Sequence, residues 1–135
     1  MLDHGENVGR KIVFIDDHLQ IVELLSIILE RNGFQGFGAL SGQAGLNLIA
    51  SEKPDLVLLD LLMPEMDGWD VYQRMKEDEA MKGIPVIIVS AKGQAIDVIL
   101  GKHIAKVADY IVKPFTPDQL IDSINQVLSM AASGA

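Results

Sequence analysis

Residues 56–68 read LVLLDLLMPEMDG, an apolar run that ends in Asp60 and continues through a loop to Gly68. Short uninterrupted apolar runs are typical of strands buried on both faces of a parallel sheet. In open α/β sheets, ligands bind outside the carboxyl ends of the strands. The stretch therefore predicts a buried strand that places Asp60 at the carboxyl-end edge of the sheet, where ligands bind.

Apolar runs of the same kind recur along the chain, and polar residues follow them. Strands are expected at residues 11–15 (KIVFI), 34–38, 56–60, 84–90 (IPVIIVS) and 110–113 (YIVK). The second of these is weakly predicted because it is rich in glycine. The polar residues at the strand ends are Asp16, Asp17, Asp60, Ser90 and Lys113.

Segments with helical apolar spacing separate the strands. Helices are expected at residues 19–32, 41–51, 69–78 and 94–105, and from Pro117 onward. Gly33 supplies a stop signal for the first, and Thr116 with Gln119 forms a capping box for the last. The final helix carries one apolar stripe, made of Leu120, Ile121, Ile124, Val127 and Leu128.

Five strand–helix units imply an α/β fold, a parallel sheet with helices on both faces. A length of 135 residues suits one domain. We expect a loosely ordered segment at residues 1–10, the domain at residues 11–130 and a frayed tail at residues 131–135. The stretch from Ala95 to Ala108 has apolar residues on more than one helical face, which fits either an extra binding surface or burial at the helix ends.

Composition narrows the function classes. The formal charge of −8, from 19 acidic and 11 basic side chains, argues against direct nucleic-acid binding. The absence of cysteine removes disulfides and thiolate chemistry and fits a reducing compartment, so we expect a cytoplasmic protein. No apolar run approaches the length that spans a bilayer, so no membrane insertion is expected.

Each polar residue at a strand end has an ordinary explanation alone, such as helix capping or a solvated charge. Together they gather three carboxylates, a hydroxyl and an ammonium at one edge. Two like charges about 4 Å apart repel by roughly 4 kcal/mol at an effective dielectric near 20. Clustered carboxylates therefore need a cation or shifted pKa values, and an all-oxygen site suits Mg²⁺, with Mn²⁺ as a substitute.

Over residues 11–128 the chain resembles the receiver domains of two-component response regulators. The resemblance rests on Asp16-Asp17, on Asp60 within the loop that ends at Gly68, on Ser90-Ala91, and on Lys113-Pro114-Phe115. It implies a flavodoxin-like fold with strand order 2-1-3-4-5. Such domains are phosphoacceptor switches, which catalyse only their own phosphorylation and dephosphorylation and are not otherwise enzymes.

The resemblance also assigns roles to the site residues. Asp60 would accept a phosphoryl group from a sensor histidine kinase or a histidine phosphotransfer protein. Asp17, Asp60 and the backbone carbonyl of Leu62 would hold Mg²⁺ directly, and Asp16 largely through water. Lys113 would neutralise phosphoryl charge, and a cis peptide bond before Pro114 would aim it into the site.

Two residues would carry the switch in this family. The Ser90 hydroxyl would approach the phosphoryl oxygens, and Tyr110 would turn inward. The readout would be the surface of the fourth helix, fifth strand and fifth helix, recognised by a downstream effector protein or output domain.

Other residues receive less weight. Asp67 is assigned to the turn and helix start. His18 opens a helix next to carboxylates, so it is expected to lie beside the metal ligands or to be exposed instead of binding the metal itself. Two departures from the family occur: Lys106-Val107 replaces the usual glycine-containing loop before Ala108-Asp109, and Leu62 lacks a polar atom to orient water. The second predicts slow self-dephosphorylation.

Two other functions compete with this interpretation. A haloacid-dehalogenase-like phosphatase also uses a strand-end aspartate, but it needs a second aspartate where Leu62 stands. A receiver-fold docking module that works without phosphate is the stronger alternative, although the complete set of acidic residues with Lys113 argues against it.

Overall fold

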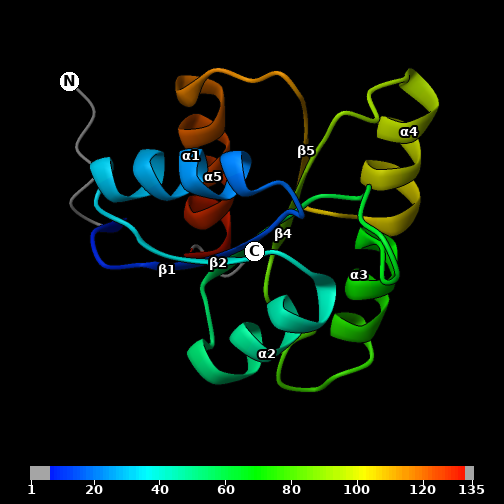
Figure 1. Ribbon diagram of the computed structural model, residues 1–135, viewed down its shortest axis with the longest axis horizontal. Coiled ribbons are helices and arrows are strands. Elements are labelled where there is room, and N and C mark those ends of the chain that lie inside the picture. Colours follow the sequence, from blue (N-terminus) through cyan, green and yellow to red (C-terminus); the bar gives the residue numbers. More distant parts are fainter. Residues whose placement is uncertain (1–6, 133–135) are drawn as a thin grey trace.

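The computed structural model describes residues 7–132, which form a five-stranded parallel sheet with helices on both faces (Figure 1). The strand order is β2-β1-β3-β4-β5, which confirms the predicted fold. The elements are β1 (Lys11–Ile15), α1 (Leu19–Arg31), β2 (Gln35–Ala39), α2 (Gly42–Glu52), β3 (Leu56–Leu59), α3 (Gly68–Lys76), β4 (Val86–Ser90), α4 (Ala95–Ile99), the π-helix η2 (Leu100–Ala105), β5 (Asp109–Val112) and α5 (Pro117–Ala132).

The three central strands owe their burial to their unbroken apolar runs. Side chains alternate between the faces of a strand, so each run supplies both sides of the sheet. In β1, Ile12 and Phe14 face α1 and α5, while Val13 and Ile15 face α2 and α3. The result is two hydrophobic clusters that share no residue.

Capping side chains fix the starts of several helices, and in α2 the Ser41 Oγ accepts a hydrogen bond from Ala44 N at 3.2 Å. Asp67 accepts a hydrogen bond from the Asp70 backbone N–H at 2.9 Å, and the Asp70 carboxylate accepts one from the Asp67 N–H at 3.1 Å. Thr116 and Gln119 form the predicted reciprocal pair at the start of α5. Asp67 therefore belongs to the beginning of α3, as expected.

Several element bounds differ from the expected ones. The fourth strand begins at Val86 instead of residue 84, consistent with Pro85 having no N–H to donate to a sheet. The predicted helix at residues 94–105 is α-helical only from Ala95 to Ile99 and continues as η2, which has the wider π-helical turn.

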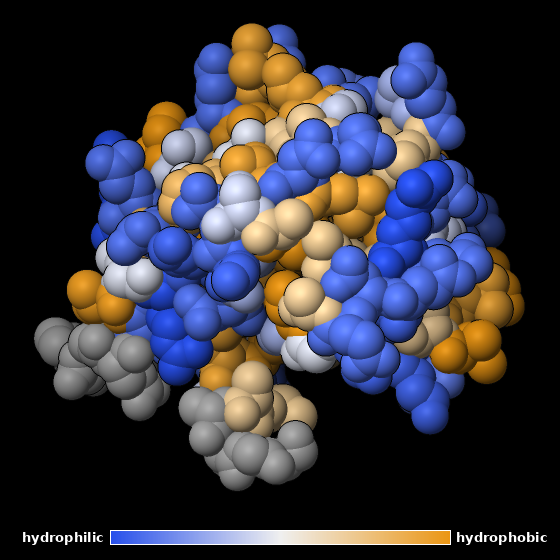
Figure 2. Space-filling model, turned by 90° about the horizontal axis from the view of Figure 1, so that it is seen from below, coloured by the Kyte–Doolittle hydropathy of each residue, from blue (hydrophilic) through white to orange (hydrophobic). Residues whose placement is uncertain are grey.

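The fourth helical segment is not well buried, which contradicts the second of the two interpretations offered for it. Ile96, Ile99, Leu100 and Ile104 are 55%, 48%, 47% and 71% exposed. Hydrophobic residues also appear among hydrophilic ones on the face seen from below (Figure 2). No described helix is both long and apolar enough to cross a membrane.

Both ends of the domain extend further than expected. Asn7 is buried, and its Nδ2 donates to Asn125 Oδ1 of α5 at 2.7 Å. Gly9 N donates to the Gly33 carbonyl at 2.8 Å, and α5 continues through Ala132. The remaining residues of the two segments predicted to be loose, 1–6 and 133–135, lie outside the described residues.

Lys106 ends η2 in the left-handed backbone region, with φ 60° and ψ 43°. This region costs a residue with a Cβ roughly 1 kcal/mol, a cost that glycine avoids. We expect Lys106→Gly to raise the free energy of unfolding by about 1 kcal/mol in urea denaturation. Lys106→Ala is the matched control, because it removes the same side chain but keeps the Cβ. Equal midpoints for the two variants would contradict the prediction.

Candidate functional site

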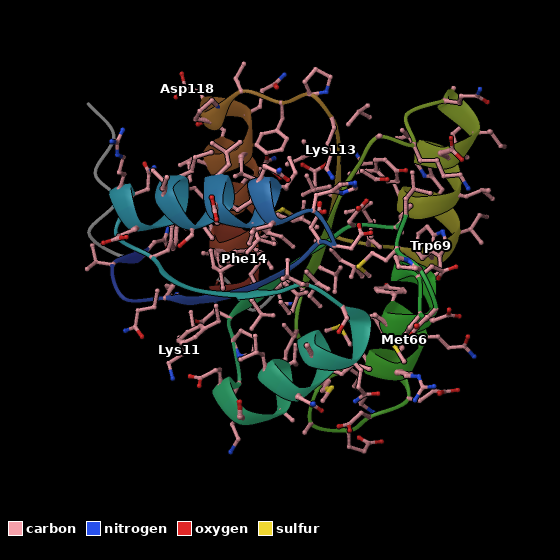
Figure 3. The ribbon with its side chains drawn as sticks, viewed as in Figure 1. Lys11, Phe14, Met66, Trp69, Lys113 and Asp118 are labelled. Atoms are coloured by element: carbon pink, nitrogen blue, oxygen red, sulfur yellow. The ribbon has the colours of Figure 1, made fainter. Side chains whose placement is uncertain are left out.

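The sheet brings the predicted site residues to one edge. Ile15 pairs with Leu59, so Asp16 and Asp60 follow neighbouring strands, and the Asp60 N–H donates to the Ile15 carbonyl at 3.0 Å. Ser90 ends β4 beside β5, from which Lys113 follows directly. Figure 3 shows Lys113 near the start of α1, where β1 ends.

Four side chains form a compact cluster of possible metal ligands. Asp16, Asp17, His18 and Asp60 each place one ligand atom within 4.8 Å of the others. Asp16 and Asp60 are only 2% and 3% exposed, whereas Asp17 is half-buried. The predicted gathering of three carboxylates is therefore present in the structure.

Lys113 provides the positive charge of this cluster. Its Nζ lies 2.6 Å from Asp16 Oδ2 and 3.6 Å from Asp60 Oδ2. The ammonium thus bonds Asp16 and faces Asp60. The peptide bond between Lys113 and Pro114 is cis.

Burial raises the pKa of the Asp60 carboxyl above its ordinary value of 3.8. The nearby Lys113 ammonium lowers this pKa, and the Asp16 carboxylate raises it. Hydrogen bonds from the Leu62 backbone N–H and the Ser90 hydroxyl lower it further. The effects of burial and of the Asp16 charge are together larger than the opposing ones, so the Asp60 pKa is raised overall. The single positive charge of Lys113 therefore does not fully offset the burial of the carboxylates.

The donor set fits a divalent cation. Asp17 Oδ1 is buried, and it has no hydrogen-bond partner among the described residues. A buried carboxylate oxygen without a partner is costly, and metal coordination would satisfy it. Carboxylate oxygens are ligands that Mg²⁺ and Mn²⁺ accept.

Ser90 and Tyr110 lie beside this cluster. Ser90 is fully buried, and its Oγ accepts a hydrogen bond from Lys92 N at 3.2 Å. Tyr110 is 7% exposed and points inward, with its hydroxyl donating to the Lys92 carbonyl. A Cβ at Gly101 would come within 2.8 Å of the Tyr110 ring, so glycine leaves room for the inward position.

The loop after β3 approaches the cluster through its backbone. Leu62 N lies 3.3 Å from Asp60 Oδ1, and the Leu62 side chain is 49% exposed. The role expected for the Leu62 carbonyl stays a prediction. Gly68 packs on the backbone of Asp60, because a Cβ there would lie 2.2 Å from the Asp60 carbonyl oxygen.

His18 was expected beside the metal ligands or exposed, and the structure agrees with both: its side chain is 62% exposed and its ring contacts the cluster. His18 Nδ1 lies 3.0 Å from Asp16 Oδ1 and 3.3 Å from Asp17 Oδ1. Its position directly after two aspartates at a strand end was the available signal. These contacts do not test whether His18 binds a metal directly, so that part of the expectation stays a prediction.

Comparison with known families and curated relatives identifies one group. The model of the response regulator receiver domain matches residues 12–125. The phosphate regulon transcriptional regulatory protein PhoB of Pseudomonas aeruginosa is 35% identical over 94% of this chain, which spans 55% of that protein. The alkaline phosphatase synthesis transcriptional regulatory protein PhoP of Bacillus subtilis is 33% identical over 90% of this chain and 49% of its own length. The chain thus spans about half the length of these relatives.

Solved structures show the same similarity. The N-terminal domain of a response regulator receiver protein from Methanoculleus marisnigri is 38% identical, with a TM-score of 0.71, over 87% of this chain and 95% of that one. A putative response regulator from Chloroflexus aurantiacus is 28% identical, with a TM-score of 0.82, over 90% of this chain and 98% of that one.

Proposed function

Because this chain belongs to the response regulator receiver domain family, we propose that it is a phosphoacceptor switch in which Asp60 receives a phosphoryl group with the help of Mg²⁺. The observation that carries the proposal is the position of Asp60. It directly follows the central strand β3, is nearly inaccessible, and shares one cluster with Lys113 and two other aspartates.

The cation would be held by Asp16, Asp17 and Asp60, with the Leu62 carbonyl completing the protein's share and Mn²⁺ able to substitute. Asp17 Oδ1, which lacks a hydrogen-bond partner among the described residues, supports a ligand role for this side chain. Bound there, the cation would supply positive charge to the phosphoryl oxygens.

Residues of the chain itself position the reacting groups. An Asp60 carboxylate oxygen attacks the phosphorus of a donor phosphohistidine, forming a P–O bond as the P–N bond breaks with its electron pair left on nitrogen. Lys113, whose Nζ already lies 3.6 Å from Asp60 Oδ2, stabilises negative charge that develops on the phosphoryl group. The donor class proposed is a sensor histidine kinase or a histidine phosphotransfer protein.

The switch would pass from Ser90 to Tyr110 and then to the surface formed by α4, β5 and α5. Phosphoryl oxygens on Asp60 would offer strong acceptors to the Ser90 hydroxyl, which is already close enough to affect the Asp60 pKa. Lys92 N donates to Ser90 Oγ, and the Lys92 carbonyl accepts from Tyr110, so one residue connects both switch side chains. An effector protein or output domain would recognise the result.

Phosphodonor labelling tests the proposal. The protein is incubated with acetyl phosphate in the presence of Mg²⁺ or of EDTA, and intact-mass spectrometry counts the phosphoryl groups gained. We expect one group with Mg²⁺, mapped to Asp60 after borohydride reduction, and almost none with EDTA. An unlabelled protein, or a label on another residue, would reject the proposal.

The exposed apolar side chains of α4 and η2 favour one competing function, a docking module that works without phosphate. Four of these side chains are about half exposed or more, and such clusters mark interaction surfaces. The labelling experiment separates the two functions. A chain that takes up no phosphoryl group and still binds a partner would be a docking module.

Leu62 predicts how long the phosphoryl group persists. Its side chain is exposed beside the Asp60 loop and has no polar atom to orient an attacking water. We expect Leu62→Asn to lose its label several-fold faster than the parent, because an amide can hold that water in line. The decay is followed by phosphate release, with Leu62→Met as the apolar control. A Leu62→Asn variant with the parent's rate would contradict the prediction.

A further inference from the structure

His18 is held at the acidic cluster by two contacts, although its side chain is 62% exposed. Its backbone N–H donates to Asp16 Oδ1 at 2.9 Å, and its Nδ1 lies 3.0 Å from the same oxygen. The residue is the N-cap of α1, yet its side chain makes no capping hydrogen bond. The imidazole therefore faces the cluster.

One proton on Nδ1 cannot serve both neighbouring carboxylates well. The ring bonds Asp16 Oδ1, while Asp17 Oδ1, 3.3 Å from the same nitrogen, has no hydrogen-bond partner among the described residues. A cation between Asp17 Oδ1 and Nδ1 would satisfy both atoms. The imidazole would then carry its proton on Nε2.

The separation of these two atoms suits a shared metal ion. In a tetrahedral zinc site with bonds of about 2.0–2.1 Å, neighbouring ligand atoms lie roughly 3.3 Å apart. The distance from His18 Nδ1 to Asp17 Oδ1 is 3.3 Å. Little rearrangement would be needed to place one cation on both.

The chemistry of the ligand atoms then determines which cation binds more tightly. Imidazole suits Zn²⁺ and similar transition metals, whereas Mg²⁺ prefers oxygen ligands and retains its waters. We propose that His18 Nδ1 is a direct ligand in this centre and makes it bind Zn²⁺ in preference to Mg²⁺. This inference rests on the proposed metal centre and not on phosphoryl transfer.

Calorimetric titration of the unphosphorylated protein with Zn²⁺ and with Mg²⁺ tests the inference. His18→Asn keeps a short hydrogen-bond donor beside Asp16 but removes the imidazole. We expect it to weaken Zn²⁺ binding about 10-fold or more and Mg²⁺ binding less than about 3-fold. The matched control is the double variant His4→Asn/His103→Asn, which removes the other two histidines and should bind Zn²⁺ like the parent.

Nitrogen NMR of the imidazole gives a second readout, independent of affinity. Zn²⁺ should shift the His18 Nδ1 resonance strongly, and Mg²⁺ should leave it nearly unchanged. If His18→Asn weakened Zn²⁺ and Mg²⁺ binding equally, or left Zn²⁺ binding unchanged, the proposed role of His18 would be wrong. The Mg²⁺ centre proposed for the parent protein would still stand. A parent protein that binds neither metal would overturn the metal centre of the proposed function as well.

Discussion

Asp60→Asn takes up no phosphoryl group from acetyl phosphate under conditions that label the parent fully. The amide has nearly the shape of the carboxylate, but its oxygen is a far weaker nucleophile and cannot form the acyl phosphate. We expect the label to fall at least about 100-fold in intact-mass spectrometry, because one bond-forming atom is lost. Asp67→Asn is the control, since Asp67 caps α3. An Asp60→Asn variant that labels as the parent does would remove Asp60 from the mechanism.

The same variant should be more stable than the parent in metal-free buffer near pH 7. Burial raises the pKa of Asp60, so the folded state binds this proton more tightly than the unfolded chain does. The protonated carboxyl therefore stabilises the folded state at low pH. This contribution to the free energy of unfolding is lost as pH rises from about 3.8 through the higher pKa of the folded state. Asparagine carries no such titration, so urea midpoints measured across this range should decline less steeply in the variant.

Gly68→Ala unfolds at a much lower denaturant concentration than the parent. An added Cβ would lie 2.2 Å from the Asp60 carbonyl oxygen and 2.8 Å from Leu61 Cα, and neither backbone atom can rotate away as a side chain could. Overpacking of this kind costs about 3 kcal/mol or more, although alanine alone would favour the helix by about 1 kcal/mol.

Gly83→Ala is the matched control for this prediction. A Cβ at Gly83 meets no atom within 4 Å, and its stability should change by less than about 0.5 kcal/mol. Urea denaturation followed by circular dichroism measures both variants. If Gly68→Ala were as stable as Gly83→Ala, the close approach between α3 and the Asp60 loop would be wrong.

Sequence patterns predicted the sheet well because the central strands are hydrophobic without interruption. The runs that contain Val57 and Ile88 could hardly be anything but buried strands, and polar residues mark where they end. Parallel strands present the same ends at one edge, so the cluster of Asp16, Asp60 and Lys113 followed from the strand order.

The local backbone was less predictable. Apolar residues of α4 and η2 occur on more than one helical face, and such a pattern does not distinguish an α-helical turn from a π-helical one. Glycine usually indicates a left-handed backbone position, and Lys106 occupies one without being glycine. The contacts of the His18 ring with Asp16 and Asp17 depend on the three-dimensional arrangement of the β1–α1 turn, which a sequence pattern does not specify.

The sheet lies between the two hydrophobic clusters, and each cluster contributes separately to the stability of this domain. Among the described residues the two clusters share no member, so truncations such as Leu29→Ala and Met75→Ala, one in each cluster, remove different packing contacts. Their costs should sum in a double variant, as they do for distant sites. Either layer could therefore be redesigned for thermostability, or loosened to tune flexibility, without recalculating its counterpart.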